Sequence, residues 1–213
     1  KAPLPTVLER GAFTCRERSA SIRADPRPAV RFAQRASTSE PQLQPRQHGI
    51  EYSAVHHDSD FFITTNDEAP NFRLVRAPVT NPARENWSTV LPYRPEVKLD
   101  GVEAFRAHLA ILERQAGLRQ IRILDLKSGQ DHLIPFPEPV YTVRTHANPE
   151  FDTSLLRFTY SSLVTPSSIV EYDMAGRSWM VRKQTEVLGG YDPSLYRSER
   201  LFAKAADGTQ VPI

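Results

Sequence analysis

The sequence is poor in cysteine and in long hydrophobic runs. Cys15 is the only cysteine among the 213 residues, so an intrachain disulfide is excluded and nothing indicates an oxidising compartment. No segment approaches the ~18 consecutive apolar residues of a membrane-spanning helix, and no signal-peptide hydrophobic region stands at the N-terminus. We therefore expect a cytoplasmic protein without a membrane partner.

An excess of charge of one sign is also lacking. The chain carries 27 Lys and Arg against 25 Asp and Glu, a formal charge of +2, which is too small to indicate a nucleic-acid partner. Residues 1–44 differ from the rest, because they mix Arg, Pro and Ser without an apolar period of 2 or 3.6. We expect a poorly ordered leader there, the alternative being a basic arm that binds an acidic partner.

Proline, in contrast, is plentiful, and 18 prolines suit many short strands and turns better than long helices. Three segments of the chain repeat one pattern: an alternating apolar strand, a polar turn of similar length and a second alternating strand. They begin at Phe62, Leu109 and Arg157, about 47 residues apart. A spacing of roughly 40 to 50 residues is typical of the blades of a β-propeller.

Two further candidate strands accompany each segment. One follows it, starting at Asn86, Gln130 and Arg177, and one precedes it, in "IEYSAVHH", "GVEAFRA" and "VYTVRTH". Four antiparallel strands make one propeller blade. The fold class is therefore predicted to be all-β, an incomplete β-propeller of about three blades over residues 45–188. "VEAFRAHLAILERQ" has a helical composition, but its place in the repeat favours strands.

Three blades do not close a ring, because known propellers need at least four. An open stack would leave the first and last blades with one apolar face uncovered, and a repeat unit cannot bury such a face alone. We therefore expect either an incomplete chain or one that must find partners.

Several stretches, in one order, resemble the oligopeptidase B group of the prolyl oligopeptidase family of serine peptidases. They include "FFITTNDEAPNFRLVRAPV", "ENWSTVLPYRP", "FPEPVYTVRTHANPEFDTSLLRFTYSSLVTPSSIVEYDM" and "KQTEVLGGYDPSLYRSERLFAKAADGTQVPI". The resemblance runs from about Pro45 to Ile213. It implies a seven-bladed propeller above an α/β-hydrolase domain, with an active site between them that admits short peptides and cleaves after Arg or Lys.

The same resemblance implies that the three repeats are the last three blades. Residues 189–213 would then be a linker and the first hairpin of a truncated peptidase domain, with Asp207-Gly208 as the turn pair. The missing remainder of the peptidase becomes an expected partner, and no cofactor is expected.

Catalytic machinery is another absence. An α/β-hydrolase raises its nucleophile in G-x-S-x-G, because the glycines permit the sharp strand-to-helix turn, and this sequence contains no such motif. The resemblance puts the Ser, Asp and His of the triad beyond Ile213. We therefore assign no catalytic residue and expect the chain to be inactive alone. The alternative is a stand-alone propeller-derived module for protein interaction.

Two polar constellations invite a functional interpretation. Ser194 lies near Asp192 and Tyr196, but no glycine elbow surrounds it and no His follows it, so we interpret it as a linker residue. His56 and His57 are potential metal ligands, yet adjacent side chains on a strand point to opposite faces. We therefore expect a polar turn there and no metal site.

The remaining candidates are acidic, amide and aromatic residues. "TNDEAPNF" lacks the ligand spacing of a calcium loop, so Asn66 and Asn71 are predicted to be turn residues. Trp87 and Trp179 are predicted to pack between blades, with peptide binding as the alternative. The hypothesis for the acidic residues is that they face the central cavity and steer basic peptides. These residues are Glu51, Glu103 and Glu138.

Overall fold

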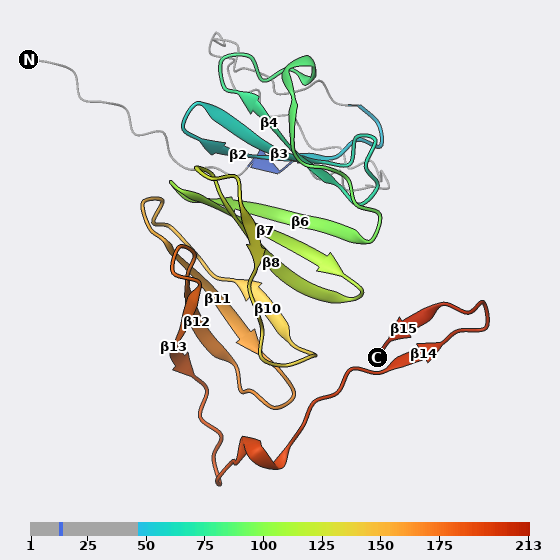
Figure 1. The fold of residues 1–213 in the computed structure, drawn as a ribbon, viewed down its shortest axis with the longest axis vertical. Helices are drawn as coiled ribbons and strands as arrows, with labels where there is room; N and C mark the ends of the chain where they lie inside the picture. The colour runs from blue at the N-terminus through green and yellow to red at the C-terminus, as the bar shows by residue number, and fades with distance from the viewer. Residues whose placement is uncertain (1–12, 15–46) are drawn as a thin grey trace, which may run out of the picture.

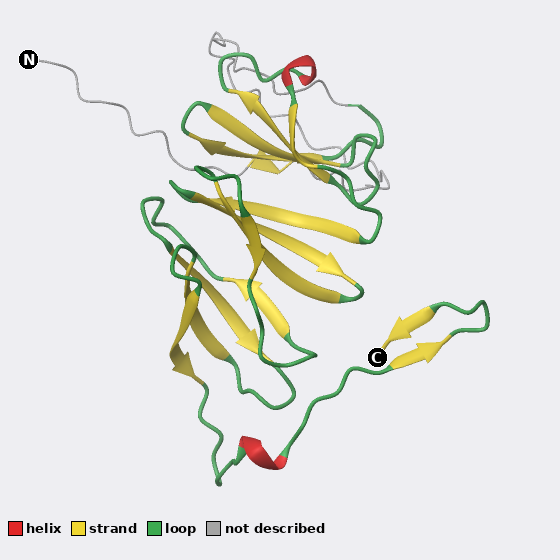
Figure 2. Cartoon of the chain, in the orientation of Figure 1, coloured by secondary structure: helices red, strands yellow, loops and turns green. Residues whose placement is uncertain are grey.

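The computed structural model describes residues 13–14 and 47–213, and strands dominate this part of the chain (Figure 1). The predicted leader, residues 1–44, lies outside the described residues except for the two-residue strand β1 (Phe13–Thr14). Helical structure in the described part is limited to two single 3-10 turns, η1 (Arg84–Asn86) and η2 (Pro193–Leu195) (Figure 2).

Thirteen strands build three antiparallel sheets, each in sequence order. Blade 1 contains β2 (Tyr52–His57), β3 (Asp60–Thr65), β4 (Arg73–Pro78) and β5 (Ser88–Leu91), with β1 added beside β2. Blade 2 contains β6 (Val97–Ala104), β7 (His108–Gln115), β8 (Leu118–Asp125) and β9 (Asp131–Leu133). Blade 3 contains β10 (Thr142–Thr145), β11 (Leu155–Ser161), β12 (Ser168–Asp173) and β13 (Ser178–Gln184). The hairpin β14 (Phe202–Lys204) and β15 (Gln210–Pro212) stands apart.

This architecture confirms the predicted all-β fold and its blades of four strands. Residues 102–115, whose composition favours a helix, instead form the end of β6 and all of β7. These two strands pair at seven positions, from Val97 opposite Gln115 to Ala104 opposite Leu109. The blades stack face against face in chain order (Figure 1). Pairing across the sheet therefore decides the structure there, whatever the intrinsic helix propensity of Ala, Leu and Glu.

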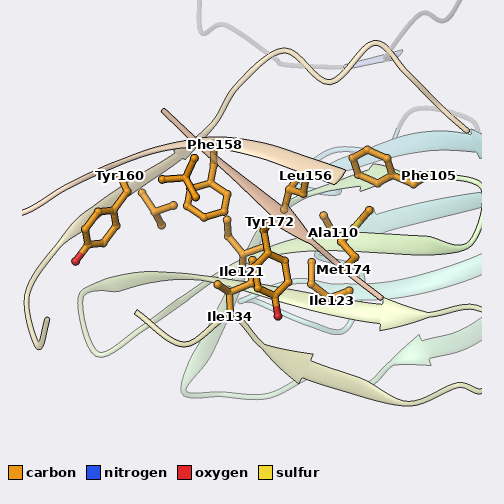
Figure 3. Close-up of a cluster of buried hydrophobic side chains, with 12 residues drawn as sticks. Phe105, Ala110, Ile121, Ile123, Ile134, Leu156, Phe158, Tyr160, Tyr172 and Met174 are labelled. Atoms are coloured by element: carbon orange, nitrogen blue, oxygen red, sulfur yellow. The ribbon is translucent and has the colours of Figure 1, made fainter. Parts of the chain in front are cut away.

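Apolar side chains that alternate along the strands fill both interfaces between blades. On β11, Leu156, Phe158 and Tyr160 are buried and join residues of β7 and β8, such as Ile121, in one cluster (Figure 3). A second cluster joins Phe62 and Leu74 of blade 1 to residues of blade 2. The period of 2 that marks a strand thus gives each blade one face for each neighbour.

The blades approach one another most closely at their first strands. Outside the sheets, strand contacts join β2 and β3 to β6, and β8 to β10. Each of these contacts includes the first strand of a blade, β6 or β10. The first strands therefore lie nearest the centre about which propeller blades are arranged.

One predicted feature of the repeat is wrong: the three central turns differ in length. β3 and β4 are separated by residues 66–72 and β11 and β12 by residues 162–167, whereas β7 and β8 are joined by Ala116–Gly117 alone. Both turn residues have positive φ, 47° and 83°. This is the conformation whose twist matches a tight hairpin, and glycine adopts it readily. β7 and β8 consequently extend to eight residues each.

The two end faces of the stack are not alike, although apolar faces were expected at both. On blade 1, the face turned away from blade 2 is apolar, and its Ala54, Ile63, Val75 and Ala77 are buried. On blade 3, the face turned away from blade 2 is mixed: Arg157 and Glu171 lie there beside the exposed Leu155 and Met180. A uniformly apolar face is therefore not found at this end of the stack.

An ion triad occupies that outer face of blade 3. The carboxylate of Glu171 accepts hydrogen bonds from the Nε of Arg157 at 3.1 Å and of Arg182 at 2.5 Å. Both guanidinium groups are about half exposed, at 48%. These hydrogen bonds lower the pKa of Glu171. A solvated ionic face costs far less free energy than an exposed apolar one, so the outer face of blade 3 tolerates water.

A second carboxylate, Glu113, is buried between blades 1 and 2, with its side chain only 1% exposed. Its Oε1 accepts from Nε of Arg122 at 2.8 Å and from Arg94, and Arg122 also pairs with Asp131. A buried charge that loses one partner is strongly destabilising. Glu113 therefore holds three strands and the loop before β6 in one electrostatic network.

We expect Glu113→Gln to lower the free energy of unfolding by about 3 kcal/mol, because two guanidinium groups lose their shared anion. Urea denaturation followed by circular dichroism measures this change. The matched control is Glu85→Gln, an exposed residue in η1, which should change it by less than about 0.5 kcal/mol. Equal effects of the two variants would contradict the assignment.

Candidate functional site

The C-terminal hairpin marks one side of the stack. This side, called here the hairpin side, carries the β3–β4, β7–β8 and β11–β12 turns. Arg200 donates a hydrogen bond to the carbonyl oxygen of Ala116 in the β7–β8 turn. A Cβ added at Gly117 would lie 3.2 Å from Cγ of Pro212, so β15 also touches this turn. Figure 1 shows the hairpin β14–β15 beside the ends of the long strands of blade 2.

The linker before the hairpin is fastened to blade 3 on the same side. The hydroxyl of Tyr191 donates to the carbonyl oxygen of Val164 in the β11–β12 turn, and the ring of Tyr191 stacks on Tyr196 with centroids 5.5 Å apart. The chain that follows the propeller strands thus runs back across the hairpin side from blade 3 to blade 2.

A polar groove opens between blades 2 and 3. Strands β6, β7, β8 and β10 supply its charged and polar side chains, and β6 and β10 are first strands, so the groove reaches the central part of the stack. The charged and polar residues among its lining are Lys98, Asp100, Glu113, Arg114, Arg119, Gln120, Arg144 and Thr145.

Positive charge dominates this groove. Asp100 is the extra residue of a β-bulge between Leu99 and Gly101. Its Oδ2 lies 2.9 Å from Nη2 of Arg114 and 3.8 Å from Nε of Arg119. Arg144 is exposed and forms no ion pair within the described residues, and it pairs with Thr159, which alternates with the Phe158 that packs on blade 2, so its side chain belongs to the other face of blade 3. Asp100 therefore neutralises only part of the groove's positive charge.

Sequence reasoning missed these cationic residues because they are dispersed over nearly fifty positions. Their signal lies in the register of the sheet, in which Lys98 pairs with Arg114 and Arg114 pairs with Arg119. Side chains that are directly opposite in adjacent strands share one face. Only the correct register of β6, β7 and β8 would have shown that these side chains lie on one face.

The acidic residues predicted to steer peptides have local partners. Glu103 accepts a hydrogen bond from Nδ2 of Asn148 at 2.8 Å, and Glu138 accepts from Oγ of Ser162 at 2.9 Å. The backbone N–H of Glu51 donates to Oδ1 of Asn66 at 2.7 Å. Their role in steering basic peptides stays a prediction, since the groove residues are mainly cationic and do not include them.

His56 and His57 lie at the end of β2 and point to opposite faces, as predicted. The ring of His56 packs against Phe61, whereas Nε2 of His57 lies 3.1 Å from the carbonyl oxygens of Phe105 and Arg106. His57 thus ties blade 1 to the β6–β7 connection of blade 2. In the part of the chain that the structure describes, no group of three or more His, Cys, Asp or Glu is arranged to hold a metal.

The two tryptophans are packing residues, although in different places. Trp179 on β13 stacks with Phe158 and contacts Phe136, which lies on the connection between blades 2 and 3. Trp87 instead packs on the apolar cluster within blade 1 and donates from Nε1 to the carbonyl oxygen of Pro82 at 2.9 Å. This cluster lies on the face of blade 1 turned away from blade 2, so the packing of Trp87 between blades stays a prediction.

Turn residues behave as their side-chain chemistry indicates. Asn66 donates from Nδ2 to the carbonyl oxygen of Gly49 at 2.9 Å, and Asn71 donates to that of Pro95. Oδ1 of Asp192 accepts from the backbone N–H and the hydroxyl of Ser194, and these bonds lower the pKa of Asp192. Asp192 is thereby the N-cap of η2, and Ser194 lies in the first turn of this helix.

No helix in the described ranges is long and apolar enough to cross a membrane.

The geometry defines the protein first as part of a β-propeller. A family profile described as "Prolyl oligopeptidase, N-terminal beta-propeller domain" matches residues 29–185. Dipeptidyl aminopeptidase BI from Pseudoxanthomonas mexicana is 34% identical over 173 residues, which cover 80% of this chain and 24% of that protein. Protease 2 from Moraxella lacunata is 32% identical over 168 residues, 79% of this chain and 24% of that protein.

Solved structures agree with these relatives. Oligopeptidase B from Trypanosoma brucei, in a closed form with covalently bound antipain, matches with a TM-score of 0.72 and 28% identity over 80% of this chain and 25% of that chain. Oligopeptidase B from Leishmania major gives a TM-score of 0.71 at 29% identity, with the same coverage. The chain belongs to the prolyl oligopeptidase family, through its N-terminal propeller domain. It spans about a quarter of the length of the curated relatives it matches.

A titratable contact also joins blades 2 and 3. Nε2 of His132 on β9 lies 2.8 Å from the hydroxyl oxygen of Tyr172 on β12. Burial, and then the positive charge of Arg177, hold the pKa of His132 below its ordinary value of 6.5. The unfolded chain then binds this proton more readily than the folded one. The contribution to stability is therefore complete above pH 6.5 and is lost as the pH falls towards the folded pKa.

We expect His132→Gln to flatten the decrease in the urea midpoint between pH 7.5 and pH 5, because the group that titrates is removed. Urea denaturation at several pH values measures this slope. His48→Gln, at an exposed position, is the control and should leave the slope unchanged. An identical slope in wild type and His132→Gln would show that this histidine does not set the dependence.

Proposed function

We propose that this chain supplies the later propeller blades of a serine peptidase that hydrolyses short peptides after Arg or Lys. The observation that carries the proposal is the match of the three blades to oligopeptidase B over 80% of the chain at 28% identity. Under this proposal residues 45–188 form the propeller portion. Residues 189–213 form the linker and the first hairpin of the peptidase domain.

The position of the hairpin supports this division of the chain. β14 and β15 pair only with each other in the described part of the chain, and they reach blade 2 through Arg200 and Pro212. A hairpin that touches the propeller at one turn suits the start of a second domain covering the hairpin side. The propeller would then limit access to a site between the two domains.

The catalytic step is assigned to residues outside this sequence. Nucleophilic hydrolysis needs an activated Ser with a His to take its proton. Ser194 is hydrogen-bonded to Asp192 and has no neighbouring histidine among the described contacts. The propeller's own part in the reaction is therefore the selection and orientation of peptides.

Activity assays test this proposal. The 213-residue chain alone should not hydrolyse a fluorogenic Arg-Arg coumarin amide, whereas a protein that contains it with a Ser-Asp-His domain should. The latter activity should be blocked by a fluorophosphonate and should exceed that on matched Pro and Ala substrates at least about tenfold in kcat/KM. Fluorophosphonate-sensitive turnover by the chain alone would contradict the proposal, as would a preference for Pro.

A second candidate is a stand-alone propeller-derived module that binds other proteins. The observation that favours it is the ionic outer face of blade 3, since terminal repeats that end a stack carry a polar outer face. Light scattering separates the candidates. A compact, stable monomer or dimer of the chain favours the module, whereas aggregation favours a piece of a larger peptidase.

A further inference from the structure

The outer edge of blade 3 differs from the outer edges of blades 1 and 2. Strands β5 and β9 are the last strands of their sheets, and they contain only four and three residues. Pro92 follows β5 directly, and Pro135 stands two residues after β9. Short edge strands and prolines hinder pairing with another chain, because they offer few backbone groups and proline has no N–H. These two edges are therefore protected.

Strand β13 has neither protection. It contains seven residues and lies at the end of its sheet, where β12 is its only partner among the described residues. Residues 174–192 contain no proline. All seven residues of β13 are exposed. The free edge of this strand therefore presents unpaired backbone N–H and C=O groups to solvent.

Three consecutive apolar side chains stand on this free edge. Trp179, Met180 and Val181 are 36%, 56% and 52% exposed. The partners of Trp179 and Val181 on β12 belong to the core between blades 2 and 3, so both side chains lie on the face turned towards blade 2. Met180 lies on the opposite face, because successive residues of a strand alternate. A strand that is apolar on both faces and unpaired along one edge is a template for a further strand.

The charged end of β13 limits how far a further strand can pair. The register with β12 skips Arg182, which is the extra residue of a β-bulge. The guanidinium of Arg182 is already bound to Glu171 of the same sheet, with Nε 2.5 Å from Oε2. Lys183 follows the bulge and is exposed. Because a bulge disrupts the ladder, regular pairing is limited to residues 178–182.

We propose that β13 pairs with the same strand of a second copy of this chain, in antiparallel orientation and centred on Met180. In this register Trp179 lies opposite Val181 of the second copy, and the two Met180 side chains lie opposite each other. Directly opposite residues share one face of a sheet, and both pairs meet this condition. Aromatic and β-branched side chains form favourable cross-strand pairs, and Ser178 is placed opposite Arg182. The pairing covers all three apolar side chains, and no like charges lie directly opposite within it.

This pairing is closed, and it does not depend on the proposed function. One two-fold axis relates the two copies, so each β13 edge is used once and no third chain adds to it. β13 and the first strand β10 lie at opposite ends of the sheet, so the central strands and the hairpin side stay free. The proposal therefore holds for the chain alone and for a longer protein that contains it.

Sedimentation velocity of the 213-residue chain between about 1 and about 200 µM tests the proposal, because small interfaces dissociate in this range. A monomer–dimer equilibrium is expected. Val181→Lys should weaken the dimer at least about tenfold, because it buries an ammonium group opposite Trp179. Leu163→Lys is the matched control. It changes a more exposed apolar residue on the β11–β12 turn and should leave the equilibrium unchanged.

A crosslink tests the register. In a Cys15→Ser background, Met180→Cys should form an intermolecular disulfide rapidly on mild oxidation, because the two Cβ atoms at the centre of the pairing lie about 5 Å apart. Leu155→Cys is the control, since Leu155 lies on the same face of blade 3 but on β11. It should crosslink at least about tenfold more slowly, because strands β12 and β13 of both copies separate the two thiols.

The proposal is overturned if the wild type stays monomeric at the highest concentration, or if it forms polymers that keep growing with concentration. Equal effects of Val181→Lys and Leu163→Lys would also overturn it, as would equal rates of crosslinking in the two cysteine variants. Loss of folding in Val181→Lys cannot imitate the result, because Met180→Cys reports a gain of crosslinking in a folded chain.

Discussion

The structure depends on apolar packing between the faces of successive blades. A four-stranded sheet has two faces, and a single blade cannot bury either of them by itself. Phe158 and Tyr160 of blade 3 are buried against residues such as Ile123 of blade 2, and Phe62 is buried between blades 1 and 2. Each interface therefore stabilises two sheets at once, and it fixes the positions of the first strands relative to each other.

The repeat could be predicted from the sequence because its signal is local. Alternation of apolar residues with a period of 2, recurring about every 47 residues, indicates blades without any knowledge of their partners. The length of the β7–β8 turn was predicted wrongly, because the polar residues on either side of Ala116–Gly117 gave the appearance of a longer turn. The different packing of Trp87 and Trp179 depends on the tertiary fold, which no local pattern specifies.

The charged residues show the same limit more clearly. Glu113, Glu171 and Asp100 are ordinary acidic residues in the sequence, but one is buried between blades, one lies on an outer face and one faces a groove. Strand register and the bulge at Asp100 determine which of these three environments each carboxylate occupies. The sequence indicated no catalytic residue and no metal site, and the cationic groove became visible only when β6, β8 and β10 were placed together.

These features together describe a rigid scaffold with one chemically distinctive side. The apolar interfaces fix β6 and β10, and Asp100 in the bulge of β6 lies near Arg114 and Arg119. The C-terminal hairpin contacts the β7–β8 turn of the same blade. Side chains held in place by such strands lose little entropy when they bind a ligand.

Hydrogen exchange, measured by mass spectrometry on wild type and Phe158→Ala, tests the central claim that the blades are stabilised mutually. The cavity left by Phe158→Ala should accelerate exchange in β11 and β12, and equally in β7 and β8 across the interface. Acceleration confined to blade 3 would contradict the account, because the blades would then be independently stable sheets.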